Sequence, residues 1–219
     1  MSIALSLGNN LTTGGIFKPA AVNNTSVNNV TDFAGIVADA TLVLLSTQTA
    51  SASASISFTS GIDSTYDEYI FKFINIHNSI DNAVFTFNGS TDGGSNYNVV
   101  KTTTTFGAYH NEADNNSNLT YFSGNDIAQG TGYQNLFTEQ GIQDDVNSCG
   151  ELHLFAPSSN TFVKHFIFTC SDMLQNDYAR QDFVAGYFNT TSAINAVDFK
   201  MSSGNIDDGI IKMYGVAKS

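Results

Sequence analysis

The chain has 219 residues, which is room for one large domain, or one domain and a tail, with a core that needs no disulfide or metal support. Only 13% of the residues are charged, and the formal net charge is −12. Because DNA, RNA and anionic lipid surfaces are also negative, this charge argues against nucleic acid and membranes as partners. No apolar run approaches the ~20 residues that span a bilayer, and the N-terminus lacks the pattern of a signal peptide. We therefore expect synthesis in a cytoplasm.

The first 40 residues have a different composition from the rest. Asn, Thr and Gly alternate there with scattered apolar side chains, too irregularly for a helix and too often for a plain linker. We expect an extended N-terminal arm over residues 1–40, ordered by lying on another surface. A first strand or a disordered leader of the same domain is the alternative. The expected attachment residues are Ile16, Phe17, Val22, Val27, Val30 and Phe33.

From residue 41 onward the pattern is that of β-strands. The short apolar run Leu42–Ser46 is followed by Ser53–Thr59 and Tyr66–His77, which a turn-rich pentapeptide separates. In the third run, alternate residues are aromatic, which predicts a strand with one face in a core. That face holds Tyr69, Phe71 and Phe73, whereas Ile70, Ile74 and Ile76 share the other face with Glu68 and Lys72. Such a strand belongs inside a sheet that packs against a second sheet.

Later runs repeat this pattern at short intervals. Asn78–Asp81 carries turn residues at hairpin length, and the only helical candidate is a turn or two near Ser171–Arg180. Ten or eleven short strands predict an all-β fold, an antiparallel, jelly-roll-like β-sandwich over residues 41–219. The later runs are Asn82–Asn88, Tyr97–Phe106, Gly150–Phe155, Thr161–Cys170, Asp182–Phe188, Ala193–Met201 and Gly209–Val216.

The segment 107–148 is the least regular part of this domain. Its polar loops are separated by short runs, and long loops on a β scaffold are where binding surfaces usually lie. We expect a receptor-binding region here, whose tyrosines could stack on sugars; ordinary core packing of these tyrosines and a plain polar loop are the alternatives. The candidate residues are Tyr109, His110, Glu112, Asp114, Tyr121 and Tyr133.

No sequence motif points to catalysis or to a bound metal. The His110–Asp114 segment holds three possible ligands, and Asp144-Asp145 and Asp207-Asp208 could face calcium, but none has a recognised ligand spacing. We therefore expect no enzyme activity, no metal and no cofactor. The two cysteines, Cys149 and Cys170, are expected to be reduced and partly buried, although sequence alone leaves their pairing open.

The amino-acid sequences of several segments resemble those of a family of small virion structural proteins of tailed bacteriophages, notably of marine and cyanobacterial hosts. The likeness covers roughly Leu42 to Val216 and fails in the loop-rich middle and in the first forty residues. It implies a virion component, made in the bacterial host cytoplasm, and it brings no catalytic residues. The segments are ISFTSGIDSTYDEYIFKFINIH, FNGSTDGGSNYN, LHLFAPSSNTFVKHF, FVAGYFNTTSAINAVDFKMSSGNIDDG and IKMYG.

The resemblance leaves two roles. In the first, the chain is a capsid decoration or cement protein, a homo-oligomer with a trimer favoured, anchored to major capsid or tail protein through residues 1–40. In the second, it is a tail-fibre or head-fibre module that binds a host-surface glycan through the loops of residues 107–148. Low charge with abundant Asn, Ser and Thr suits both.

Overall fold

The computed structural model describes residues 42–217, and every regular element there is a β-strand. The expected arm, residues 1–40, and its six attachment residues lie outside this range. The strands are β1 (Leu42–Ser53), β2 (Ile56–Phe58), β3 (Glu68–Asn78), β4 (Ala83–Ser90), β5 (Lys101–Asn111), β6 (Ser117–Tyr121), β7 (Gln134–Gln140), β8 (Ser148–Phe155), β9 (Lys164–Leu174), β10 (Tyr178–Phe188), β11 (Ala196–Met201) and β12 (Ile206–Val216).

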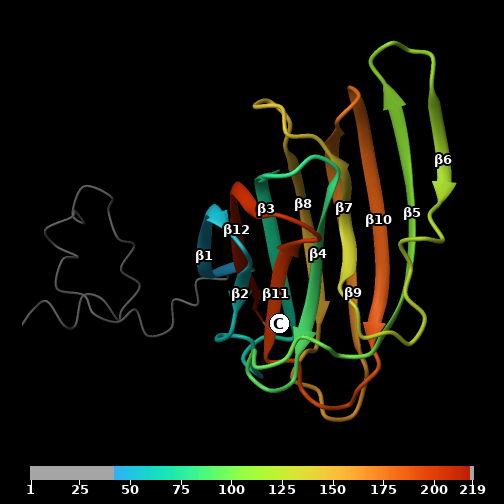
Figure 1. Cartoon of the computed structure of the whole chain (residues 1–219). Helices are drawn as coiled ribbons and strands as arrows, with labels where there is room; N and C mark the ends of the chain where they lie inside the picture. Colours follow the sequence, from blue (N-terminus) through green and yellow to red (C-terminus); the bar gives the residue numbers. More distant parts are fainter. Residues whose placement is uncertain (1–41, 218–219) are drawn as a thin grey trace, which may run out of the picture. The chain divides into compact units, whose positions relative to one another are not determined.

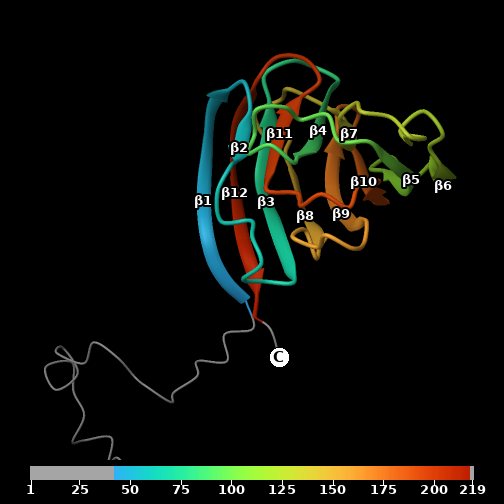
Figure 2. The same ribbon diagram turned by 90° about the horizontal axis from the view of Figure 1, so that it is seen from below.

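These strands form two antiparallel layers (Figures 1 and 2). The larger layer has the order β1-β12-β3-β8-β9-β10-β5-β6, and the smaller has the order β2-β11-β4-β7. A single residue pair, Gln140 with Leu174, joins β7 to β9 and so connects the layers. The predicted antiparallel β-sandwich is confirmed, while its jelly-roll character stays a prediction.

Phenylalanine rings fill the space between the layers. Phe73 of β3 contacts Phe85 and Phe199 of the smaller sheet, with ring centroids 5.4 and 5.1 Å apart. Phe137 of β7 and Phe168 of β9 close the same cluster at 5.3 Å from each other. Each such pair contributes about 0.5–1.5 kcal/mol beyond the burial of its area. Many of the phenylalanines in this Phe-rich, Trp-free sequence therefore pack together in one aromatic core.

Strand β3 has the predicted core face, with one exception. Tyr69, Phe71 and Phe73 are at most 1% exposed, as expected, but Ile76, assigned to the mixed face, is also fully buried. A bulge is the reason: the pairing with β8 shifts between Phe73 and Ile76, and Asn75 there has φ of 53°. One inserted residue reverses the alternation, so that Ile76 returns to the core.

Two local predictions were wrong. The segment Ser171–Arg180 is not helical but the end of β9, a tight turn and the start of β10. Asn78–Asp81 does not close a hairpin, because β3 pairs with β12 and β8 whereas β4 pairs with β7 and β11. The link instead carries the chain from one layer to the other. In both cases the side chains fitted a local turn, and long-range pairing decided the outcome.

The larger sheet extends beyond the smaller one. The smaller layer ends at β7, whereas β5 and β6 continue the larger layer past it, as the right side of Figure 1 shows. Part of the inner face of β10 and β5 therefore has no sheet opposite it. Loop residues after β6 lie there instead, and a cleft forms between them and β7.

Candidate binding cleft

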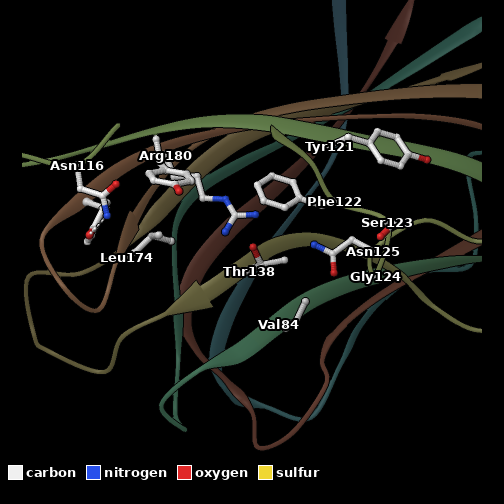
Figure 3. A pocket seen from close by; sticks show the side chains of 12 residues that line it. Val84, Asn116, Tyr121, Phe122, Ser123, Gly124, Asn125, Thr138, Leu174 and Arg180 are labelled. Atoms are coloured by element: carbon white, nitrogen blue, oxygen red, sulfur yellow. Dashed lines mark hydrogen bonds between the residues drawn. The ribbon is translucent and has the colours of Figure 1, made fainter. Parts of the chain in front are cut away.

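The cleft has a volume of about 650 Å³ and lies between β7 on one side and β5, β6 and β10 on the other. This volume is typical of small-molecule sites, which span ~300–1,000 Å³. Figure 3 shows the side chains around it. The lining residues are Val84, Tyr109, Asn116, Tyr121, Phe122, Ser123, Gly124, Asn125, Thr138, Leu174, Tyr178 and Arg180.

Arg180 and Phe122 form the centre of the cleft. The guanidinium carbon of Arg180 lies 4.3 Å from the centroid of the Phe122 ring, and Nε donates to Oδ1 of Asp182 at 2.9 Å. Both charged side chains are almost completely buried, with exposures of 4% and 0%. The backbone amide of Phe122 donates to the carbonyl of Thr105 at 3.0 Å, which fixes the ring beside β5. The arginine charge is thus balanced internally, and the ring face is held rigidly.

Two tyrosines and an asparagine form one wall. The rings of Tyr109 and Tyr178 meet edge to face at 5.7 Å, and Nδ2 of Asn116 donates to the Tyr178 hydroxyl at 2.9 Å. The Oδ1 of Asn111 accepts from the backbone amides of Asn115 and Asn116 at 3.1 and 2.9 Å. This closed turn between β5 and β6 holds Asn116 in place. The wall therefore offers aromatic surface and amide groups in a fixed arrangement.

The opposite wall is polar and comes from β7 and the loop after β6. Asn125 is held by Asn135, whose Nδ2 donates to its Oδ1 at 3.0 Å, and by Gln134, whose Nε2 donates to its carbonyl at 2.8 Å. Thr138 is 5% exposed, and its hydroxyl has no hydrogen-bond partner among the described residues. In Figure 3 its oxygen is on the side of the guanidinium of Arg180. A buried hydroxyl that lacks a partner is stabilised by any ligand or water that supplies one.

The structure separates the residues that the sequence grouped into one receptor-binding region. Tyr109 lines the cleft, as does Tyr121, but Tyr121 pairs with Phe106 across β5 and β6 and so has its ring on the outer face of the larger sheet. Tyr133 lies elsewhere: its hydroxyl donates to Oδ2 of Asp198 at 2.9 Å, and Lys200 lies 4.1 Å over its ring. Their functional role stays a prediction.

His110 and Glu112 line a second cavity, of about 460 Å³, with Asp177 among its other residues. Asp114 is outside it, 91% exposed, and pairs with His110 at 3.0 Å. Glu112, Asp177 and the buried Asp172 are therefore three carboxyl side chains around one depression. Within residues 42–217, no group of three or more His, Cys, Asp or Glu side chains is arranged to hold a metal ion.

The sequence did not reveal Phe122, Asn116, Tyr178 or Arg180 as cleft residues. Tyr178 and Arg180 fall in the segment that was expected to be helical, and β10 meets β5 only through pairing across more than sixty residues of chain, with Arg180 opposite Tyr109. The alternation Tyr178, Arg180, Asp182 on a strand was the available signal. It places three polar side chains on one face, which in a sandwich is a departure from the core pattern.

A buried polar network lies next to the cleft, behind Arg180. The Ser148 hydroxyl donates to Oδ1 of Asp172 and accepts from Nε2 of Gln140 at 2.6 Å, and Gln140 also donates to the carbonyl of Ile76 at 2.6 Å. Burial raises the pKa of Asp172 to about 7, and the negative charge of Asp182 adds to the increase. Asp172 is thus largely protonated below neutral pH, unlike a surface carboxyl.

Cys149 and Cys170 are both free, on adjacent strands, but Cys149 pairs with Ser171 and Cys170 with Gly150, so the two thiols point to opposite faces of the sheet. Burial raises the pKa of the Cys170 thiol well above its usual value. Among the described residues there is no helix with the length and hydropathy to cross a bilayer.

The described part of the chain is therefore an all-β sandwich with a lateral, aromatic and amide-lined cleft. Comparison with protein-family models, with curated proteins and with solved structures found no match.

Proposed function

We propose that this chain is a non-enzymatic structural protein of a tailed-bacteriophage virion and that its cleft binds a neutral glycan of the host surface. The likeness of its segments to virion structural proteins supports the first part. The observation that carries the second part is the combination, in one cleft, of the Phe122, Tyr109 and Tyr178 rings with the amides of Asn116 and Asn125.

The chemistry of the lining favours a sugar. The apolar face of a pyranose ring packs on an aromatic ring, while its hydroxyls need donors and acceptors around the edge, here the asparagine amides and the Thr138 hydroxyl. Among the described residues that line the cleft, Arg180 is the only charged one, and Asp182 balances it. In addition, the net charge of −12 opposes an anionic ligand. A neutral oligosaccharide therefore fits better than a sialylated or phosphorylated one.

The test compares two tyrosines in titration calorimetry against oligosaccharides prepared from the host surface. Tyr109→Ala should weaken binding by about tenfold or more, since it removes an aromatic wall worth ~1.4 kcal/mol or more. Tyr133→Ala, a matched change at another half-buried tyrosine, should leave the affinity unchanged. Equal effects of the two variants, or no binding by the wild-type protein to any host oligosaccharide, would contradict the cleft as the glycan site.

The rival class is a carbohydrate-active enzyme. Glycosidases use two carboxyl groups across a cleft, and Glu112 and Asp177 line the second cavity together. Our proposal expects intact oligosaccharide after prolonged incubation with the wild-type protein, followed by chromatography. Cleavage that disappears in Glu112→Gln would replace the proposed function with a hydrolase.

Capsid decoration through residues 1–40 is the second candidate, favoured by the apolar side chains within that Asn-rich stretch, where Lys18, Asp32 and Asp39 are the charged residues. If it is right, purified protein binds expanded capsids, and deletion of residues 1–40 abolishes this binding. Full binding without these residues would rule out anchoring by the arm.

A further inference from the structure

The outer face of β9, β10, β5 and β6 differs from the rest of this acidic chain. These four strands contain five charged side chains, and all five are buried, with exposures of 8% or less. No Asp, Glu, Lys or Arg side chain of these strands is therefore turned to solvent, although at the β6 edge the Tyr121 hydroxyl donates to the carboxylate of Asp126. The five buried side chains are Lys101, Lys164, Asp172, Arg180 and Asp182.

The same face exposes large apolar side chains. Phe106 of β5 is 43% exposed, Leu119 of β6 71%, Tyr121 of β6 54% and Ile167 of β9 49%. The pairing registers place them on one side of the sheet, because Phe106 is opposite both Tyr121 and Phe183, and Ile167 is opposite Ala185 of β10. We call this surface the β6–β9 face.

The side chains of the β6–β9 face are already ordered. The rings of Phe106 and Phe183 stack at 5.0 Å with an angle of 11° between their planes. Beside them is a depression of about 450 Å³, which Thr104, Ile167 and Tyr187 help to line. Rigid aromatic rings lose little side-chain entropy on association, which favours their use at an interface.

The adjoining half of the sheet shows what an ordinary solvent face of this chain looks like. On β3 and β8, Lys72 pairs with Glu151 at 3.3 Å, and His153 contacts Glu68. The change from charged to uncharged occurs between β8 and β9. Contiguous exposed apolar surface with a polar rim marks a contact surface in soluble proteins.

We propose that the β6–β9 face binds a second copy of this chain, face to face. A copy with net charge −12 is repelled by every acidic surface of the first, so self-association is least opposed where both copies present few charged side chains. An uncharged, two-fold-symmetric contact of one face with itself meets this condition. A basic partner protein would instead be attracted to the acidic surfaces and would gain nothing from this face.

The area of the face sets the expected strength. Strands β5, β9 and β10 have 11 residues each and β6 has five. At ~3.3 Å per residue and ~4.8 Å between strands they cover roughly 600 Å². This is about three quarters of the ~800 Å² per partner in a standard interface. The association should therefore depend on concentration rather than be permanent, and it should increase at the high local concentration of an assembling particle.

Sedimentation of the full chain over a wide range of concentrations tests the proposal. Wild-type protein should shift from monomer to oligomer, and Ile167→Glu should weaken this association by about tenfold or more, since it places two like charges against each other. Ile142→Glu is the matched control. Ile142 is 48% exposed and lies outside the face, and Ile142→Glu has the same net charge as Ile167→Glu. It should associate like the wild-type protein apart from a small general effect of the added charge.

A wild-type chain that is monomeric at every concentration, or equal weakening by both glutamates, would overturn the proposal. If Ile167→Glu does not fold, as judged by circular dichroism, Leu119→Glu replaces it, since that side chain is 71% exposed and makes no core contact. These outcomes do not depend on glycan binding, because the Phe122 and Arg180 side chains are on the inner side of the sheet.

Discussion

At the scale of single residues, the buried carboxyl of Asp172 controls how stability depends on pH. Its pKa is about 7 in the folded protein and near the ordinary 3.8 in the unfolded chain. Between these values the folded state holds the extra proton, so stability falls as pH rises from about 4 to about 7. The effect is on the order of 4 kcal/mol and is fully expressed above pH 7.

Asp172→Asn tests this directly. The amide oxygen can still accept from Ser148, and the variant cannot ionise, so its free energy of unfolding should exceed that of the wild-type protein at pH 8 by roughly 4 kcal/mol. The difference should vanish near pH 4. Urea unfolding at a series of pH values measures it, and a difference between the two proteins that stays constant with pH would show that Asp172 has an ordinary pKa.

The alternation of residues in the sequence predicts only in part which side chains of strand β9 are buried. Lys164 shares a face with Phe166 and Phe168 in the sequence, and it is indeed buried with them, where its ammonium donates to the carbonyl of Thr190 at 3.0 Å. The same alternation would put Phe162 on this face as well, but Phe162 is 72% exposed, because β9 begins only at Lys164. Periodicity thus predicts the faces of a strand, but it does not show where the strand starts.

At the scale of elements, the bulge in β3 depends on a glycine in the neighbouring strand. Gly209 of β12 has φ of 130°, and a Cβ atom there would lie 2.9 Å from the carbonyl oxygen of Asn75 and 2.8 Å from Cδ1 of Ile76. The register between β12 and β3 shifts on both sides of Asp208, so the two irregular segments lie against each other. Gly209 allows the close approach that returns Ile76 to the core.

We expect Gly209→Ala to destabilise the protein by roughly 2 kcal/mol, since it combines an unfavourable backbone angle with contacts that are too close. Thermal unfolding followed by circular dichroism is the measurement. Gly124→Ala serves as control, because Gly124 has no strained φ and a Cβ there meets nothing within 4 Å. If both variants unfold at the wild-type temperature, the bulge does not require glycine at position 209.

The elements themselves could largely be predicted from the sequence, but the way they pair could not. Alternating Tyr69, Phe71 and Phe73 were enough to place β3 against a second sheet. Nothing local distinguishes Asn78–Asp81 as a crossover between sheets from the same residues as a hairpin, since both need a short polar turn. The cleft depends on the long-range pairing of β10 with β5, which local sequence patterns do not predict.

At the scale of the whole molecule, charge and apolar surface are separated in space. The charged residues of the β3–β8 half of the larger sheet contrast with the uncharged β6–β9 face, while the cleft lies on the inner side of the same β5 and β10 strands. One pair of strands thus supplies a wall of the proposed glycan site on its inner side and the proposed self-association surface on its outer side. Tyr121 belongs to both surfaces.

This separation predicts how salt affects self-association. Two chains of net charge −12 repel each other at long range, and salt screens that repulsion, with a Debye length of ~30 Å at 0.01 M falling to ~8 Å at 0.15 M. No Asp, Glu, Lys or Arg side chain of the four strands faces this contact, so there is no ion pair between these strands for salt to weaken. Sedimentation at low and at physiological salt should therefore show stronger association at the higher salt, with Ile142→Glu behaving in the same way. Weaker association at higher salt would mean that attractive ion pairs hold the copies together, which the β6–β9 face cannot supply.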